Sequence, residues 1–241
     1  MPDPSRNAER ETRILDAAAE LIAHYGYDKT TMEDMARRAG ISKGALYLHF
    51  KGKEELVESL IIRETEVMLD DLLARLDNDE RGVTIFTIYQ YGVVTMMNRP
   101  LLRAMFMNDR RVFGELISRL RRLPAYQQMS SFGVEFVRHF QEAGLLRSDL
   151  PADTVAYILI ALRVGLLYAG EFIPADQAPT LERIGDTLAE MLEKALAPEH
   201  IEAADRERGH AALLGLTQMG RELIRQQREE RERARHKGEK P

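Results

Sequence analysis

Apolar residues recur every three or four positions along most of the chain, which is the spacing of one face of an α-helix. In residues 8–25 such a face is followed by Gly26, a residue that suits a helix end. No segment alternates apolar and polar residues over the length of a strand. The pattern therefore predicts an all-α protein.

The next segment predicts two short helices joined by a tight turn. Thr30 and Glu33 have the spacing of a capping box, in which a hydroxyl and a carboxylate satisfy the first amides of a helix. Gly40 suits the left-handed conformation that ends such a helix, and Ser42 suits the cap of a second one. A glycine turn between two short helices is typical of a helix-turn-helix, whose second helix enters a DNA groove.

The rest of the chain predicts further helices. The expected helices cover residues 53–76, 109–121, 152–170 and 181–196, and another ends near Gly144. The most apolar stretch, residues 155–170, is shorter than the roughly 20 residues that span a bilayer, and it contains Arg163. We therefore expect it to be a buried helix and expect no membrane span.

Charge supports a nucleic-acid ligand only when it is counted locally. The formal net charge of the chain is −5, but residues 35–53 contain five basic residues and no acidic residue. Phosphate binding depends on the surface patch that faces the duplex, so the local charge outweighs the total. A solvated basic helix is the alternative interpretation of this stretch.

Residues 42–50 combine several groups that suit DNA. Tyr47 and His49 can donate hydrogen bonds to phosphate oxygens. Lys43 and Gly44 stand at the start of the second helix, where free amides favour an anion and a small residue allows close approach. Ala45 is small enough to contact a base, such as a thymine methyl group.

No enzyme motif accompanies these residues. The chain has no cysteine, no phosphate-binding loop and no nucleophile motif. Glu135, His139 and Glu142 lack the second Glu-x-x-His motif that a bundle metal site needs. We therefore expect no catalytic activity, no cofactor and no metal.

The segment TTMEDMARRAGISKGALYLHFKGKEEL resembles the DNA-binding region of the TetR family of bacterial transcriptional regulators, and the likeness covers roughly residues 8–60. The resemblance implies three N-terminal helices for DNA and a helical ligand-binding domain after them. It also implies phosphate contacts for Thr31 and Lys53. The candidate DNA-binding residues are Thr31, Ser42, Lys43, Gly44, Ala45, Tyr47, His49 and Lys53.

Three regions follow from this resemblance. They are a helix-turn-helix DNA-binding domain (residues 1–52), a ligand-binding and dimerisation domain (53–198) and a C-terminal extension (199–241) that is helical or partly disordered. A homodimer is implied through the helices at 152–170 and 181–196. The extension has three possible roles: extending the dimer contact, covering the ligand pocket, or none in the structure.

The family also implies a small-molecule pocket in the second domain, without a motif that fixes its residues. The candidates are Met68, Phe86, Tyr89, Met96, Phe106, Phe132, Phe136 and Arg163. Core packing explains the apolar candidates equally well. Arg163 either pairs with a carboxylate across the bundle or the dimer contact, or offers a counter-charge to an acidic ligand.

These observations predict a cytoplasmic, homodimeric repressor that is associated with the nucleoid when bound to DNA. Its expected partners are a palindromic double-stranded operator and a small hydrophobic effector. The alternative function is a helical small-molecule carrier without sequence-specific DNA binding, and this alternative leaves the basic stretch unexplained.

Overall fold

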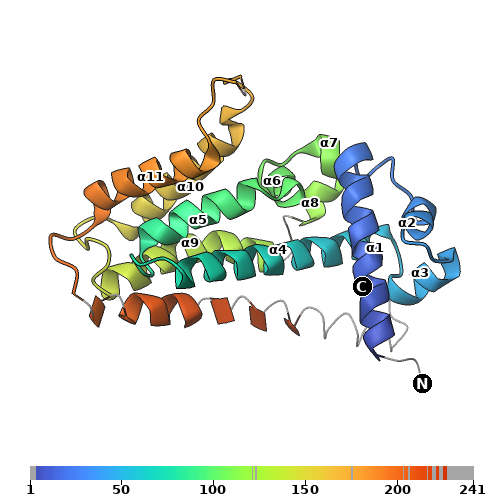
Figure 1. Cartoon of the computed structure of the whole chain (residues 1–241), viewed down its shortest axis with the longest axis horizontal. Helices are drawn as coiled ribbons and strands as arrows, with labels where there is room; N and C mark the ends of the chain where they lie inside the picture. Colours follow the sequence, from blue (N-terminus) through green and yellow to red (C-terminus); the bar gives the residue numbers. More distant parts are fainter. Residues whose placement is uncertain are drawn as a thin grey trace. The chain divides into compact units, whose positions relative to one another are not determined.

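The computed structural model describes residues 4–226 except 121, 123, 175, 203, 206, 216, 219, 220, 223 and 224, without side chains for residues 4, 5 and 124–132. All regular secondary structure in this part is helical, as predicted (Figure 1). The helices are α1 (Pro4–Tyr25), α2 (Met32–Arg38), α3 (Lys43–His49), α4 (Lys53–Asp77), α5 (Ile85–Met97), α6 (Pro100–Phe106), α7 (Arg110–Phe113), α8 (Leu116–Leu120), α9 (Pro124–Glu142), α10 (Ala152–Ala169) and α11 (Leu181–Leu196).

One predicted helix is divided in the structure. The expected helix at 109–121 is two short helices, α7 and α8, separated at Gly114. Gly114 has a φ of 54°, and a Cβ at this position would collide with the carboxylate of Asp28. Because Asp28 is distant in sequence, helical periodicity alone gave no sign of this break.

The chain forms two compact units. Unit 1 comprises residues 1–67 and 97–123, and unit 2 comprises residues 68–96 and 124–241. Our sequence-based domains had their first border after residue 52. The observed first unit is larger because α6 and α7 pack on α1, and α8 packs on α7.

Unit 1 joins the α1–α2 turn to α7 by a close backbone contact. Gly26 ends α1 with a φ of 82°, and a Cβ there would lie 2.6 Å from the carbonyl oxygen of Arg111. The amide of Tyr27 donates to the carbonyl oxygen of Val112 at 2.6 Å. Only a residue without a side chain allows this approach, so Gly26 fixes where the helix-turn-helix attaches.

Unit 2 has a continuous apolar core. It is built from α5, the C-terminal half of α4, α9, α10 and α11, and its buried members include Leu76, Phe86, Phe140, Leu159 and Leu192. Among the described residues, only α10 is long and apolar enough to cross a membrane by length and composition, with a mean hydropathy of 1.6. Only 22% of α10 is buried, contrary to our expectation of a buried helix.

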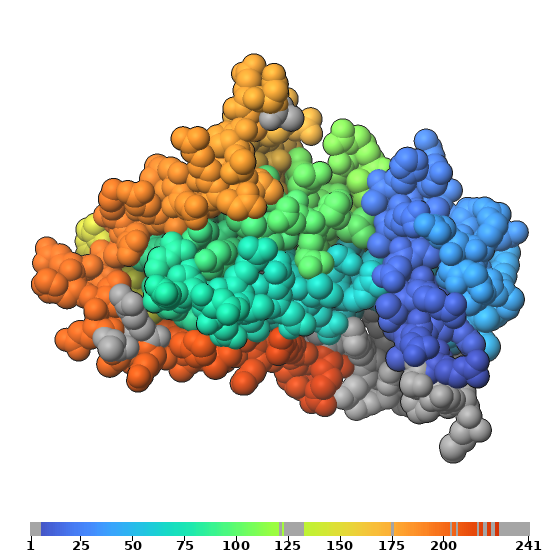
Figure 2. Space-filling model, viewed as in Figure 1, coloured from blue at the N-terminus to red at the C-terminus, as the bar shows by residue number. Residues whose placement is uncertain are grey.

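The described part of the C-terminal extension packs on unit 2. Residues 207–215 are helical, and Leu213 is a buried member of the core. Arg221 forms an ion pair with Asp70 of α4, and Figure 2 shows this part of the chain (red) at the surface. Leu213 and Arg221 therefore give the extension a structural role, and residues 227–241 lie outside the described part.

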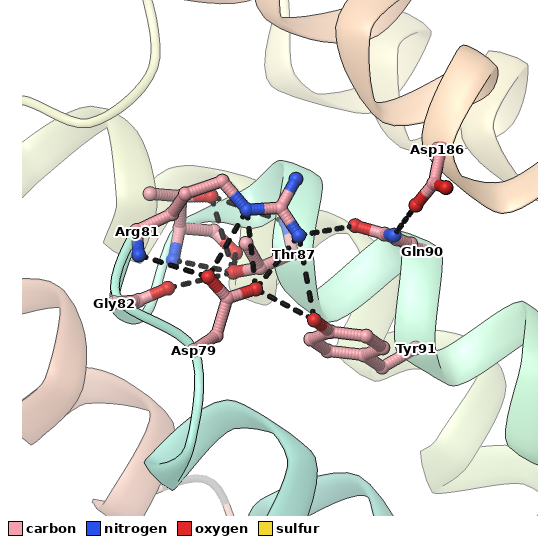
Figure 3. Close-up of polar contacts among 8 residues, drawn as sticks. Asp79, Arg81, Gly82, Thr87, Gln90, Tyr91 and Asp186 are labelled. Atoms are coloured by element: carbon pink, nitrogen blue, oxygen red, sulfur yellow. Dashed lines mark hydrogen bonds and ion pairs between the residues drawn. The ribbon is translucent and has the colours of Figure 1, made fainter. Parts of the chain in front are cut away.

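A polar network links the α4–α5 turn to α11 (Figure 3). The Asp79 carboxylate accepts bonds from the Arg81 guanidinium (Nη2, 2.7 Å) and the Tyr91 hydroxyl (2.6 Å). Arg81 also donates to the Gln90 side-chain oxygen at 2.9 Å, and the Gln90 amide donates to Asp186. Buried polar groups are stable only when they are bonded, so this network fixes the turn.

We expect Asp79→Asn to make the free energy of unfolding less dependent on pH. Bonds from Arg81 hold the pKa of Asp79 at about 2, against 3.8 for the unfolded chain. The ionised carboxylate therefore stabilises the fold above about pH 4, and this contribution is lost as the pH falls towards 2. At about 1.4 kcal/mol per pKa unit, the substitution should cost about 2 kcal/mol at neutral pH.

Urea unfolding at several pH values measures this dependence. Asp71→Asn is the control, because Asp71 pairs with Arg75 on the exposed surface of α4. Equal pH dependence in Asp79→Asn and the unchanged protein would contradict the assignment.

Candidate DNA-binding surface and effector site

α2 begins at a capping box formed by Thr31 and Asp34. The Thr31 hydroxyl accepts from the Asp34 amide, and the Asp34 carboxylate accepts from the Thr31 amide, both at 3.1 Å. The hydroxyl of Thr31 also holds the pKa of Asp34 below its usual range. The predicted pair, Thr30 and Glu33, was wrong by one residue, because Thr30 is buried and donates to the Gly26 carbonyl oxygen at 2.8 Å.

The turn between α2 and α3 is fixed by bonds on both sides. Gly40 ends α2 in the left-handed region with a φ of 68°, as predicted. The amide of Ile41 donates to the Ala36 carbonyl oxygen at 3.0 Å, which closes the helix end. Ser42 caps α3, as predicted, and its hydroxyl oxygen accepts from the Ala45 amide at 3.1 Å. The turn therefore sets the direction of α3.

α3 has one buried and one exposed face. Leu46 and His49 are buried, and so is Phe50 directly after the helix. With 7% of its surface exposed, His49 lies largely inside, and its bond to phosphate stays a prediction. The structure brings the other α3 candidates together at its start and outer side: Ser42, Lys43, Gly44, Ala45 and Tyr47.

The start of α3 leaves room for a ligand. No atom lies within 4 Å of the position that a Cβ on Gly44 would take. A phosphate group can therefore approach the backbone here closely, which is the advantage that a glycine gives at a helix start.

Leu48 is a candidate that our sequence analysis missed. Its side chain is 84% exposed, between Tyr47 and the buried His49. An apolar side chain on the outer face of α3 suits contact with a thymine methyl group in a major groove. The exposure of Leu48 could have been expected from its position in the sequence. Leu46 faces the core, and a helical residue two positions later faces away from the core.

The basic residues of the helix-turn-helix are paired with carboxylates from nearby positions. Arg37 contacts Asp34, Arg38 contacts Glu20 of α1, and Lys43 lies 3.5 Å from Glu33. The local charge that we counted from residues 35–53 is therefore partly neutralised by acidic residues outside that stretch. These pairs are exposed, where an ion pair contributes about 1 kcal/mol or less, so a phosphate can replace the carboxylate.

Lys53 begins α4, and its ammonium group has partners inside unit 1. Nζ donates to the carbonyl oxygens of Tyr27 (2.8 Å) and Thr30 (3.0 Å) and lies 4.0 Å from the centre of the Tyr27 ring. Burial lowers the pKa of Lys53 and raises that of Tyr27. These contacts tie α4 to the α1–α2 turn, which gives Lys53 a positioning role. The phosphate contact that the resemblance implies for Lys53 stays a prediction.

The predicted effector-site residues lie in different environments. Phe86 is buried in the unit 2 core, with Tyr89 and Phe136 packed against it. Met96 is buried, Met68 is half-buried, and Phe106 belongs to unit 1. The side chain of Phe132 lies outside the described part. The pocket therefore stays a prediction, and Phe86 and Met96 have the burial expected of core residues.

Arg163 lies near Tyr89. The Tyr89 hydroxyl donates to the Leu159 carbonyl oxygen at 2.6 Å. Burial raises the pKa of Tyr89 to about 12, and the charge of Arg163 opposes this shift. Both predicted roles of Arg163, a structural pair and a counter-charge for a ligand, remain hypotheses.

We expect Lys53→Ala to act on stability more than on phosphate binding. Removal of two bonds to a charged donor and of the ring interaction should lower the free energy of unfolding by about 2 kcal/mol. The salt dependence of DNA affinity should be unchanged. Urea unfolding and DNA titration test the two effects, with Lys43→Ala as a control that leaves stability unchanged. A shallower salt dependence for Lys53→Ala with unaltered stability would instead support the phosphate contact.

Comparison with known proteins agrees with this geometry. The model of the tetR family of bacterial regulatory proteins matches residues 14–60. The HTH-type transcriptional regulator SrpR of Pseudomonas putida is 24% identical over 162 residues, which are 67% of this chain and 75% of that protein.

Two solved structures share the fold. FadR from Bacillus subtilis in complex with stearoyl-CoA has a TM-score of 0.57 and 18% identity, and the match covers 75% of this chain and 96% of that one. AibR in complex with isovaleryl coenzyme A and operator DNA has a TM-score of 0.54 and 21% identity, covering 76% and 97%. The match to residues 14–60 confirms that this region resembles the tetR family of bacterial regulatory proteins, and the two solved structures show that the chain shares their fold.

Proposed function

We propose that the chain is a homodimeric repressor that reads a palindromic operator through α3 and leaves it when a small hydrophobic effector binds. The exposed face of α3 carries this proposal. Lys43, Gly44 and Tyr47 offer groups for phosphates, and Leu48 offers an apolar contact for a base edge. The capped turn before α3 supports it further, because a reading helix must be held in one direction.

Exposed apolar residues on α10 and α11 support the proposed dimer. Tyr157 is 74% exposed and Ile158 51%, and Met191 of α11 is 62% exposed. Ala161 and Gly165 are also exposed on α10, and such small residues let two helices approach closely. Apolar surface of this extent is typical of a protein interface, and a second copy of the chain is the partner that we propose.

The proposed release mechanism is a linked equilibrium. An effector that binds the DNA-free arrangement more tightly shifts the population away from DNA, and DNA weakens effector binding by the same factor. α4 supports this mechanism because its residues 53–67 belong to unit 1 and its last residues to unit 2. A change in the direction of α4 would therefore alter both units.

Selection of bound duplexes from a random DNA pool at about 0.15 M salt tests the proposed function. We expect an enriched palindrome with half-sites about one helical turn apart or somewhat more. The same selection with Leu48→Ala should lose the preference at one base pair of each half-site, while the protein remains as stable as before. No enrichment by a protein shown to be dimeric would favour the carrier alternative.

We expect Ala161→Glu to convert the dimer to a monomer. The substitution places a charge on an exposed position of α10, so the fold of the subunit tolerates it but a tight helix contact does not. Sedimentation measures the mass, and Ala8→Glu on the exposed side of α1 is the matched control. A dimer of unchanged affinity in Ala161→Glu would place the subunit contact elsewhere.

A further inference from the structure

The first turns of α1 carry three arginines outside the matched family domain. α1 begins at Pro4, ten residues before the match at residue 14. Arg6, Arg10 and Arg13 follow each other at i, i+4 and i+7, so they lie on one face of the helix. With Glu9 and Thr12 they line a shallow surface hollow. Figure 2 shows this end of α1 (dark blue) at the surface.

These arginines differ from the other basic residues near the helix-turn-helix. Within the described part of the chain, none of the three has a carboxylate within ion-pair distance, whereas Arg37, Arg38 and Lys43 each have one. A paired arginine must exchange its carboxylate for a phosphate, which reduces the gain on binding. An arginine without such a carboxylate brings its full charge and releases a counterion from the DNA.

The direction of the arginine face follows from an ion pair further along α1. Glu20 lies seven residues after Arg13, and seven residues are nearly two full turns, so the two side chains share a face. Glu20 contacts Arg38 at the end of α2. The arginine face therefore continues the side of α1 that meets the helix-turn-helix.

We propose that Arg6, Arg10 and Arg13 form a second phosphate-binding surface, which contacts the DNA backbone beside the bases read by α3. This inference rests on the proposed function, because the DNA must already be held by α3. The surface carries no base-reading group, so it adds affinity for any sequence and leaves the preferred operator unchanged.

Titration of the full chain with duplex DNA between about 50 and 200 mM salt tests the proposal. The duplexes are the selected palindrome and a random sequence of equal length. The triple variant is Arg6→Ala, Arg10→Ala, Arg13→Ala. The slope of log K against log salt should fall by about 0.9 for each phosphate that is no longer neutralised, and hence by up to about 5 for the six arginines of a dimer. Affinity at low salt should fall at least about tenfold for both duplexes.

Two controls separate charge from structure. Arg103→Ala removes an exposed arginine of α6 and should leave the slope unchanged. Replacing the same three arginines of α1 by lysine should keep the slope, because the charge is retained. If the triple alanine variant has the same slope as the original protein, and the original protein selects a palindrome, this inference alone is overturned. Failure of the unchanged protein to bind any DNA would overturn the proposed function with it.

Discussion

The contact of the Lys53 ammonium group with the α1–α2 turn holds the DNA-binding region in its arrangement. The ammonium lies against two carbonyl oxygens and the Tyr27 ring, so the first residue of α4 is bonded to the segment that ends α1. Along the chain, α3 lies between the Gly40 turn and this junction, and Phe50 is buried directly after it. A helix of seven residues has little stability alone, and it is these connections that give α3 a fixed direction.

The same junction extends to α7. The Tyr27 ring faces the Lys53 ammonium group, and the Tyr27 backbone amide donates to the carbonyl oxygen of Val112. Gly26 and Gly114 allow this approach, each with a left-handed φ and no space for a side chain. The helix-turn-helix is therefore built into a larger unit with α6, α7 and α8. In the proposed mechanism, a change in the direction of α4 would therefore reach this unit through Lys53.

Local sequence patterns predicted much of this fold, and distant contacts account for most of the errors. Spacing identified α4, α10, α11 and the glycine turn, because periodicity and capping act over a few residues. The break at Gly114 depends on Asp28, a partner that no local pattern reveals. The contact of Lys53 with Tyr27 is likewise invisible in a local pattern. The capping box was misplaced by one residue because Thr30 and Thr31 both have an acidic residue three positions later.

The candidate sites were predictable to different degrees. Residues of α3 were proposed from the sequence because DNA binding requires particular groups at a helix start, and their contacts with DNA stay predictions. Leu48 was not among them, because exposure of an apolar residue is a property of the fold. The local charge was overestimated because its carboxylate partners, Glu20 and Glu33, lie outside the basic stretch. The sequence did not identify the residues of the effector pocket, because residues such as Phe86 pack equally well in a core or around a ligand.

Amide hydrogen exchange of the full chain, with and without a selected duplex, tests most directly whether α3 is the reading helix. We expect slower exchange on DNA binding in α3 and at the start of α2, with unit 2 changed little in the absence of an effector. Protection of another surface, with exchange in α3 unchanged while the DNA is bound, would contradict it.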